Sequence, residues 1–218
     1  MAAYTAIVAG ATGLIGTELM RLLLQDPDYD KVIALVRRPA FEPQDKLRQI
    51  VTDWTPEDIE RSLRDELRHA HVFCALGTTI KKAKTQEQFR KVDLEYPLLL
   101  GRMAAKHGAS CYLLVSAMGA NRRSGIFYSR VKGEVEEGLQ EMGLKSLHIF
   151  RPSFLLGNRS EFRLGERVAQ SLSGILSKIM VGSLRPYRPI PALSVAEGMI
   201  RAAKSGREGV MVYSSHQI

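Results

Sequence analysis

The chain has 218 residues, of which 45% are hydrophobic, and a formal net charge of +8. This length and hydrophobic content are enough for one sizeable core, so we expect a single domain spanning residues 1–218. No apolar run reaches the ~18 residues of a membrane span, and the first residues lack the basic and apolar regions of a signal peptide. We therefore expect a soluble, cytoplasmic protein that does not associate with membranes.

Composition also argues against several other classes of protein. Cys74 and Cys111 both lie inside apolar runs, and the five histidines show none of the spacings typical of zinc ligands, so neither a disulfide framework nor a metal site is expected. The positive charge comes in short groups at residues 37–38, 81–84 and 122–123, without a recognition motif around them. Such groups fit a dinucleotide phosphate and solvated loops better than nucleic acid.

Apolar runs of strand length alternate with segments of helical period along the chain. The strands are predicted at residues 4–9, 31–36, 48–52, 71–76, 111–115 and 146–150, and the helices at 13–25, 56–68, 85–107 and 126–142. This alternation is typical of a doubly wound α/β fold with a parallel sheet, the Rossmann type. Residues 153–191, richer in Gly, Ser, Pro and Arg, are expected to form a small C-terminal cap on the substrate side. A helix at 192–204 and a strand at 209–213 complete the chain.

The first predicted strand runs into a glycine-rich turn, Gly10-Ala-Thr-Gly13-Leu-Ile-Gly16, which an amphipathic helix follows. Glycines here allow a tight turn, close approach of the backbone to a pyrophosphate, and close packing of helix on strand. The free N–H groups at the helix N-terminus then face the phosphates. No Gly-Lys-Ser/Thr follows, which excludes a P-loop. The turn predicts a bound dinucleotide.

Arg37 and Arg38 end the second predicted strand. A site that prefers NAD carries an acidic residue at this place, which binds the ribose 2′-hydroxyl. Two guanidinium groups instead suit the 2′-phosphate of NADP(H). The other interpretation is a solvated basic turn.

A possible catalytic set of three residues begins where the fifth predicted strand ends. Ser116 ends that strand, Tyr128 begins the next helix, and Lys132 follows four residues later on the same helical face. A lysine ammonium near the phenol favours the tyrosinate form, while Ser116 is placed to hydrogen-bond a carbonyl oxygen. The set therefore predicts a proton donor for carbonyl reduction.

The glycine turn with Ser116, Tyr128 and Lys132 resembles the short-chain dehydrogenase/reductase superfamily. Within it, residues 73–79, 89–93, 128–136 and 150–156 resemble an atypical group, the Tat-interacting-protein-like oxidoreductases, and the resemblance covers nearly the whole chain.

That resemblance implies a set of cofactor contacts along the edge of the sheet. Thr12, Leu14 and Ile15 would lie against the cofactor, and Asp53-Trp54 near the adenine. Leu76-Gly77-Thr78 would flank the ribose and nicotinamide, with Lys132 on the ribose and Pro152-Ser153 near the carboxamide. The usual residue after Arg-Pro is Gly, and Ser153 departs from it, which puts the backbone contact there in doubt. Phe154, Leu156 and Tyr187 are candidate walls of the substrate pocket.

These features together predict an NADPH-dependent oxidoreductase, monomeric or homodimeric, that reduces a small carbonyl substrate with Tyr128 as proton donor. The alternative is an NADPH-binding sensor that acts through protein partners with little or no turnover. An intact Ser-Tyr-Lys set favours the enzyme, because a sensor does not need a proton donor.

Overall fold

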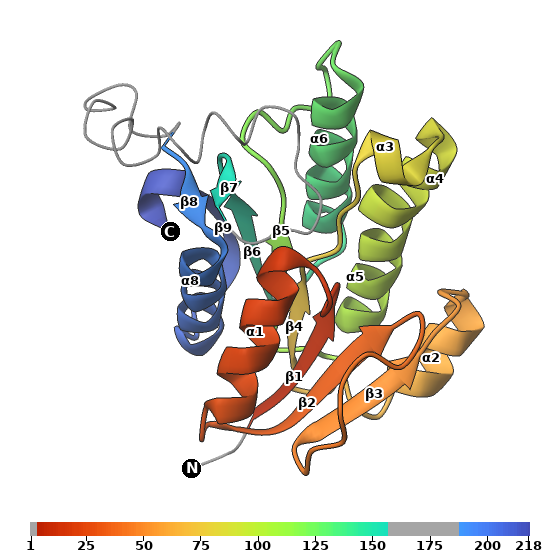
Figure 1. Ribbon diagram of the computed structural model, residues 1–218, viewed down its shortest axis with the longest axis vertical. Coiled ribbons are helices and arrows are strands. Elements are labelled where there is room, and N and C mark those ends of the chain that lie inside the picture. Colours follow the sequence, from red (N-terminus) through yellow and green to blue (C-terminus); the bar gives the residue numbers. More distant parts are fainter. Residues whose placement is uncertain (1–3, 157–187) are drawn as a thin grey trace.

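The computed structural model of the chain describes residues 4–156 and 188–218, and Figure 1 shows them as one parallel sheet flanked by helices. The strands of this sheet are β1 (Tyr4–Ala9), β2 (Tyr29–Val36), β3 (Leu47–Val51), β4 (His71–Cys74), β5 (Cys111–Val115), β6 (Ser146–Arg151) and β9 (Gly209–Ser214). Two shorter strands, β7 (Leu155–Leu156) and β8 (Ile190–Pro191), pair with each other.

The helices lie between the strands in the order that the sequence predicts. They are α1 (Leu14–Gln25), α2 (Pro56–Leu63), α3 (Ile80–Ala83), α4 (Gln86–Arg90), the π-helical segment η1 (Lys91–Glu95), α5 (Tyr96–Lys106), α6 (Phe127–Gln140), α8 (Ala192–Lys204) and the 3₁₀ turn η3 (Ser215–Gln217). In the part of the chain that the structure describes, none of these helices is both long and apolar enough to cross a membrane.

The strand order is β3-β2-β1-β4-β5-β6-β9, and every neighbouring pair in this sheet is parallel. The chain first moves outward from β1 through β2 to β3, then returns to β4 on the other side of β1. This reversal confirms the predicted doubly wound fold. Ligands in such sheets bind outside the carboxyl ends of the strands where the direction reverses, which here lies between β1 and β4.

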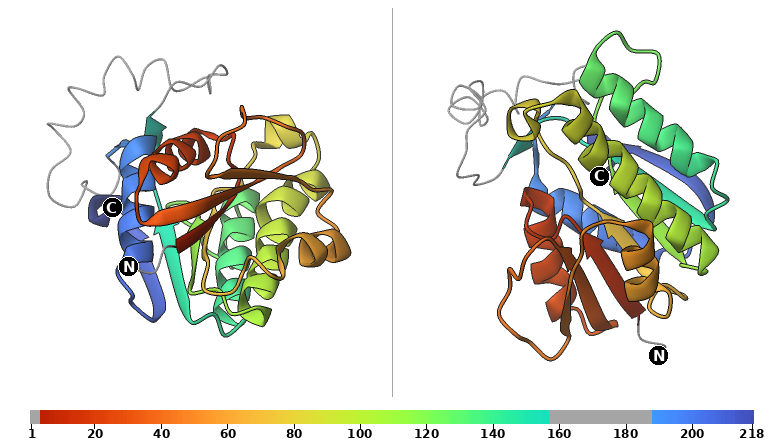
Figure 2. Two further views of the ribbon diagram at one scale, coloured as in Figure 1. Left: turned by 90° about the horizontal axis from the view of Figure 1, so that it is seen from below. Right: turned by 90° about the vertical axis from the view of Figure 1, so that its right-hand side faces the viewer.

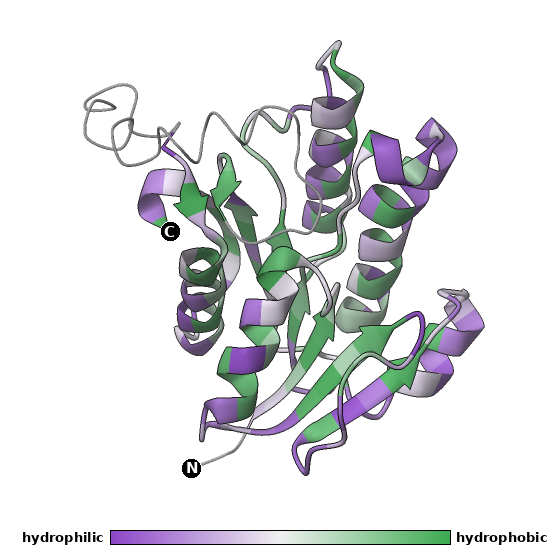
Figure 3. Cartoon of the chain, viewed as in Figure 1, coloured by the Kyte–Doolittle hydropathy of each residue, from purple (hydrophilic) through white to green (hydrophobic). Residues whose placement is uncertain are grey.

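Helices cover both faces of the sheet (Figure 2). One core cluster includes Leu19 and Leu23 of α1 with Val195 and Met199 of α8. The cluster on the opposite face takes its helical residues mainly from α2, α5 and α6, with single residues from α3, α4 and η1. Apolar residues accordingly concentrate in the strands, and hydrophilic residues in the outer sides of the helices and the loops (Figure 3). Strands buried on both faces explain the nearly uninterrupted apolar runs.

The helix predicted over 85–107 differs from a regular α-helix at its centre. The N–H of Tyr96 bonds to the carbonyl of Lys91, five residues back, as in a π-helix. Pro97 follows at once and has no N–H to donate, so it cannot continue the α-helical ladder to the carbonyl of Asp93. The π-helical turn places Asp93 in the interior, where it is 1% exposed.

The predicted cap falls mainly outside the described residues. Of the segment 153–191, the structure describes only 153–156 and 188–191, and Tyr187 lies outside them. Phe154 is 63% exposed in the described part. The cap and a wall formed by Tyr187 therefore stay predictions, as does the single-domain organisation.

A buried histidine lies in β4, at the strand end away from the switch point. His71 is almost fully buried, its Nδ1 lies 2.9 Å from the hydroxyl of Tyr29, and its ring stacks on Tyr4. Burial, assisted by the charges of Lys204 and His148, lowers the pKa of His71 to about 4.

We expect His71 to make the fold sensitive to mild acid. Histidine in the unfolded chain has a pKa near ~6.5, so between pH 6.5 and 4 the unfolded chain binds more protons and stability falls as the pH falls. At pH 5 this single group should lower the free energy of unfolding by about 2 kcal/mol relative to neutral pH. Urea unfolding at pH 7 and pH 5 measures the loss. His71→Asn, whose amide can still meet Tyr29, should reduce it, whereas the exposed control His216→Asn should not.

Candidate functional site

The glycine turn between β1 and α1 is built by three glycines with different roles. Gly10 has a φ of +84°, and a Cβ there would lie 2.5 Å from the carbonyl oxygen of Ala75. A Cβ on Gly16 would collide with the carbonyl of Gly10. Both positions are thus closed by the fold itself, which brings β1, α1 and the end of β4 together.

Gly13 differs because a side chain there would meet a tight contact and not a collision. A Cβ there would meet only the Gly10 carbonyl at 3.2 Å and the Ala75 oxygen at 4.0 Å. Gly13 is also the N-cap of α1, without a side-chain hydrogen bond to the first turn, so the leading N–H groups of the helix are left for another partner. The absence of a side chain at Gly13 is less strictly required by packing than at Gly10 and Gly16. It fits a site where a pyrophosphate comes close to the backbone.

The other residues of the turn divide into exposed and buried groups. Thr12 is exposed and Leu14 is half-buried, while Ile15 belongs to the core cluster between α1 and α8. Any contact of Ile15 with a cofactor would therefore come from its backbone.

Arg37 and Arg38 follow β2 directly and are both exposed. Because β2 is the neighbour of β1, the two guanidinium groups lie on the same edge of the sheet as the glycine turn. This position is the one at which the sequence predicts the ribose 2′-position.

Asp53 and Trp54 follow β3 on the same edge but serve local structure. The Asp53 carboxylate accepts hydrogen bonds from the N–H and the hydroxyl of Thr55, and these bonds lower the pKa of Asp53. Trp54 is 7% exposed, has a φ of 65°, and stacks on Tyr96 with ring centroids 4.7 Å apart. The indole therefore belongs to the core, and an adenine contact from this segment stays a prediction.

Asp93 joins two predicted parts of the site. One oxygen of its carboxylate accepts a hydrogen bond of 2.8 Å from the N–H of Thr78, in the loop after β4. The other oxygen lies 2.8 Å from the ammonium of Lys132, and both side chains are nearly inaccessible to solvent. Sequence reasoning missed the role of Asp93. Its charged neighbours Arg90, Lys91 and Glu95 make this stretch resemble the solvent side of a helix, so the sequence holds no local signal that the carboxylate is buried.

Tyr128 lies in the first turn of α6, with its ring edge against Phe89 at a centroid distance of 5.9 Å. Lys132 follows one turn later and is 4% exposed. Burial, the largest influence, opposes the ammonium form, but the charges of Asp93 and Tyr128 outweigh it, so the pKa of Lys132 is raised. The structure thus brings Tyr128, Lys132 and the loop around Thr78 to one place.

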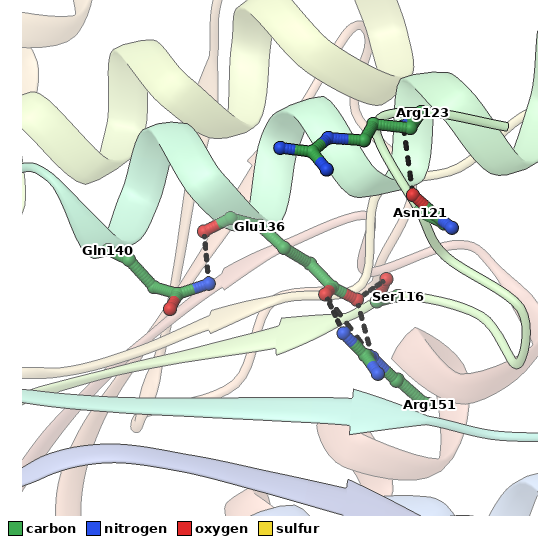
Figure 4. A network of polar contacts seen from close by, with 6 residues as sticks. All are labelled: Ser116, Asn121, Arg123, Glu136, Gln140 and Arg151. Carbon is green, nitrogen blue, oxygen red and sulfur yellow. Dashed lines mark hydrogen bonds and ion pairs between the residues drawn. The ribbon is translucent and has the colours of Figure 1, made fainter.

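Ser116 lies at the carboxyl end of β5 and is buried. Its hydroxyl donates a hydrogen bond to the carboxylate of Glu136 on α6, and Arg151 forms an ion pair of 2.5 Å with the same carboxylate (Figure 4). This contact, rather than open space, is where the structure places the Ser116 hydroxyl.

Pro152 and Ser153 lie between β6 and β7. The carbonyl of Pro152 accepts a hydrogen bond from the N–H of Met118, and the N–H of Ser153 donates to the hydroxyl of Ser215 at 2.8 Å. These backbone groups are engaged within the protein, so contact with a carboxamide there stays a prediction. Within the described ranges, no group of three His, Cys, Asp or Glu residues is arranged to hold a metal ion.

Comparison with known proteins matches this arrangement to a family. The family described as NAD(P)H-binding matches residues 10–167, from the first glycine of the turn through both Tyr128 and Lys132. The chain belongs to the NAD(P)H-binding family. It is also similar to the protein HTATIP2 of Rattus norvegicus, with 31% identity over 207 residues that cover 94% of this chain and 83% of the relative. The resemblance to the Tat-interacting-protein-like group of short-chain dehydrogenases is thereby confirmed.

Solved structures resemble the fold at low sequence identity. The Bordetella bronchiseptica enzyme WbmH, solved in complex with NAD+, superposes with a TM-score of 0.74 at 14% identity, covering 97% of this chain and 76% of the other. A UDP-N-acetylglucosamine 4-epimerase from Bacillus cereus gives a TM-score of 0.71 at 18% identity, covering 97% and 79%. These similarities confirm the Rossmann-type fold.

The predicted location requires correction. A relative from Emericella nidulans, 33% identical over 175 residues that cover 78% of this chain and 75% of the relative, is named "Protein fmp52, mitochondrial". Relatives from Candida albicans and Aspergillus fumigatus carry the same designation. These names contradict the expectation of a cytoplasmic protein. That expectation rested on the lack of an apolar span. Such a lack does not decide the location of a protein, because receptors recognise targeting signals that are not membrane spans.

The two kinds of glycine should respond differently to substitution. Gly13→Val should lower the thermal midpoint only modestly, because the φ of −80° suits any residue and the new Cβ would meet the Gly10 carbonyl at 3.2 Å. Its β-branched side chain should nevertheless abolish NADPH binding in calorimetry by blocking the approach of the phosphate. Gly10→Val should lower the thermal midpoint much more, since the new Cβ would lie 2.5 Å from the Ala75 carbonyl oxygen and φ is positive there. Normal NADPH binding by folded Gly13→Val would contradict the assignment.

Proposed function

We propose that the protein is an NADPH-dependent oxidoreductase of the short-chain type that reduces a small carbonyl substrate. The observation that carries this proposal is the pairing of Tyr128 with a buried, charged Lys132 on one face of α6. Both lie near the loop after β4, at the reversal point of the sheet where a dinucleotide binds in this fold. When bound, the nicotinamide supplies the hydride, and the chain supplies the proton and the electrostatic environment.

Tyr128 is the proposed proton donor to the carbonyl oxygen. Its phenol is half-buried, and its ring is held by Phe89, so it keeps a defined direction while the hydroxyl remains able to meet a substrate. The ammonium of Lys132 favours the negative charge that remains on the phenolic oxygen after the proton has left. A positioned donor of this kind typically contributes 10²- to 10⁴-fold to a rate, by order of magnitude.

Lys132 has the second proposed role of holding the nicotinamide ribose. An ammonium has three N–H groups, and among the described residues that of Lys132 is paired with one oxygen of Asp93, which leaves donors for a ribose hydroxyl. Asp93 fixes the ammonium in place and, through the N–H of Thr78, fixes the adjacent loop as well. The Asp93 carboxylate thus fixes the loop after β4 relative to α6, the helix that carries Tyr128.

Cofactor choice is the first test. Because Arg37 and Arg38 are exposed cations where an acidic residue would select NAD, NADPH should bind at least ~10-fold tighter than NADH. Replacing both arginines with alanine should remove that preference in calorimetric titrations and leave NADH affinity nearly unchanged. Arg64→Ala, at an exposed position after α2, provides the control. Equal affinities of the parent protein for the two cofactors would contradict the proposal.

Turnover is the second test, and it separates the enzyme from the sensor. Tyr128→Phe removes only the hydroxyl, so NADPH affinity and the thermal midpoint should be nearly unchanged. A screen of aldehydes, ketones and quinones should yield at least one substrate whose reduction falls by ~10²-fold or more in this variant. Lys132→Met should reduce both the rate and cofactor binding.

Two results would argue against the proposed roles. If the Phe variant reduces the same substrate as fast as the parent, Tyr128 is not the proton donor. If NADPH binds tightly and no carbonyl compound in the screen is reduced, the result favours the NADPH-binding sensor that acts through protein partners.

A further inference from the structure

Two buried groups, Ser116 and Glu136, meet the partly exposed Arg151 where β5, α6 and β6 come together. Glu136 is 2% exposed and Ser116 4% exposed, and the Ser116 hydroxyl donates to the Glu136 carboxylate. Arg151, the last residue of β6, donates from Nε to both oxygens of that carboxylate, at 3.0 and 3.2 Å. Its hydrogen bonds with Glu136 raise the pKa of Arg151. Figure 4 shows both partners converging on the one carboxylate.

The position of Glu136 along α6 matters for the role of Ser116. Tyr128, Lys132 and Glu136 are spaced by four residues and lie on one helical face. Eight residues correspond to about 12 Å along a helix axis. The Cα–Cβ bonds of a helix all tilt toward its N-terminus, so the two side chains leave the helix about as far apart as their backbones. Ser116 is therefore bound by a residue two turns along the helix from the residue that would protonate a substrate.

The single proton of the Ser116 hydroxyl also argues against a bond from Ser116 to a substrate. A serine hydroxyl has one proton to donate, and the Ser116 proton is already donated to a buried, charged acceptor. Hydrogen bonds to ionised groups are about twice as strong as neutral ones. Turning the hydroxyl toward a carbonyl would exchange this bond for a weaker one and leave a buried carboxylate less well satisfied.

We propose that Ser116, Glu136 and Arg151 form a clamp, here called the Ser–Glu–Arg clamp, that sets α6 against β5 and β6. Ser116 is then a positioning residue and not the donor to the substrate carbonyl. The ends of the two strands are also tied directly, because the N–H of Ser116 bonds to the carbonyl of Phe150. The clamp rests on the proposed function in one respect only, namely that the position of α6 is the position of Tyr128 and Lys132.

The test is a double-mutant comparison in the full-length chain with Ser116→Ala, Glu136→Gln and both together. The glutamine amide offers one acceptor and one donor where the carboxylate offered two acceptors, so it cannot serve Ser116 and Arg151 as before. Each single variant should lower the urea midpoint, and the double variant should lose less than the two losses combined. The matched control is Glu137→Gln, on the same helix as Glu136. It removes the exposed ion pair of Glu137 with Arg122.

Activity gives the second readout, taken with whichever carbonyl substrate the screen yields. Well below the unfolding transition, both single variants should lower kcat by ~3- to 10-fold, to a similar extent, with the KM for NADPH unchanged. The double variant should be no slower than the slower single variant. A donor role for Ser116 instead predicts a ~10²-fold or larger loss for Ser116→Ala at an unchanged urea midpoint, multiplying with the loss from Glu136→Gln. That result would overturn the clamp.

The two proposals fail in different ways. If the parent protein reduces no carbonyl, the proposed function fails, and the urea midpoints alone decide the clamp. Midpoint losses that simply add would show that Ser116 and Glu136 do not stabilise the fold together, and would reject it.

Discussion

The site depends on one buried ion pair, between Lys132 of α6 and Asp93 of η1. A buried pair is tolerated only when the remaining lone pairs and protons also find partners, and removing one member leaves an uncompensated charge. The second oxygen of Asp93 has such a partner, because it accepts a hydrogen bond from the Thr78 N–H. One carboxylate therefore holds a helix, a π-helical turn and the loop after β4 in a single arrangement. The interruption of the long helix before Pro97 is what carries Asp93 into that position.

The fold could be predicted from the sequence because its signals are local. Apolar runs of strand length mark the strands that helices cover on both faces, and the glycine spacing marks the phosphate turn. Gly10 illustrates why such a motif is informative, since its positive φ and its contact with the end of β4 exclude any side chain. The spacing of Tyr128 and Lys132 is equally local, being one turn of a helix. Each of these predictions needed knowledge of only a few neighbouring residues.

The remaining parts of the site rest on partners distant in sequence. Asp93 contacts Thr78 and Lys132, and in the sequence it reads like any acidic residue on the solvent side of a helix. Ser116 was assigned to the substrate because it ends a strand, yet the structure gives its proton to Glu136, twenty residues away. Trp54 is a similar case, because its stacking partner Tyr96 begins α5 and is distant in sequence. Sequence patterns place residues on an edge or a face but do not reveal which groups satisfy one another there.

The two sets of cations proposed to act on the cofactor are held in opposite ways. Arg37 and Arg38 are exposed, so their charges remain in contact with solvent and carry little desolvation penalty. Lys132 has been removed from water by folding and remains charged only because Asp93 lies beside it. Under the proposed function, the choice between nicotinamide cofactors would be separable from stability, whereas the placement of the proton donor would not. A substitution of Arg37 or Arg38 would change what binds, while one at Asp93 would change whether α6 is held in place at all.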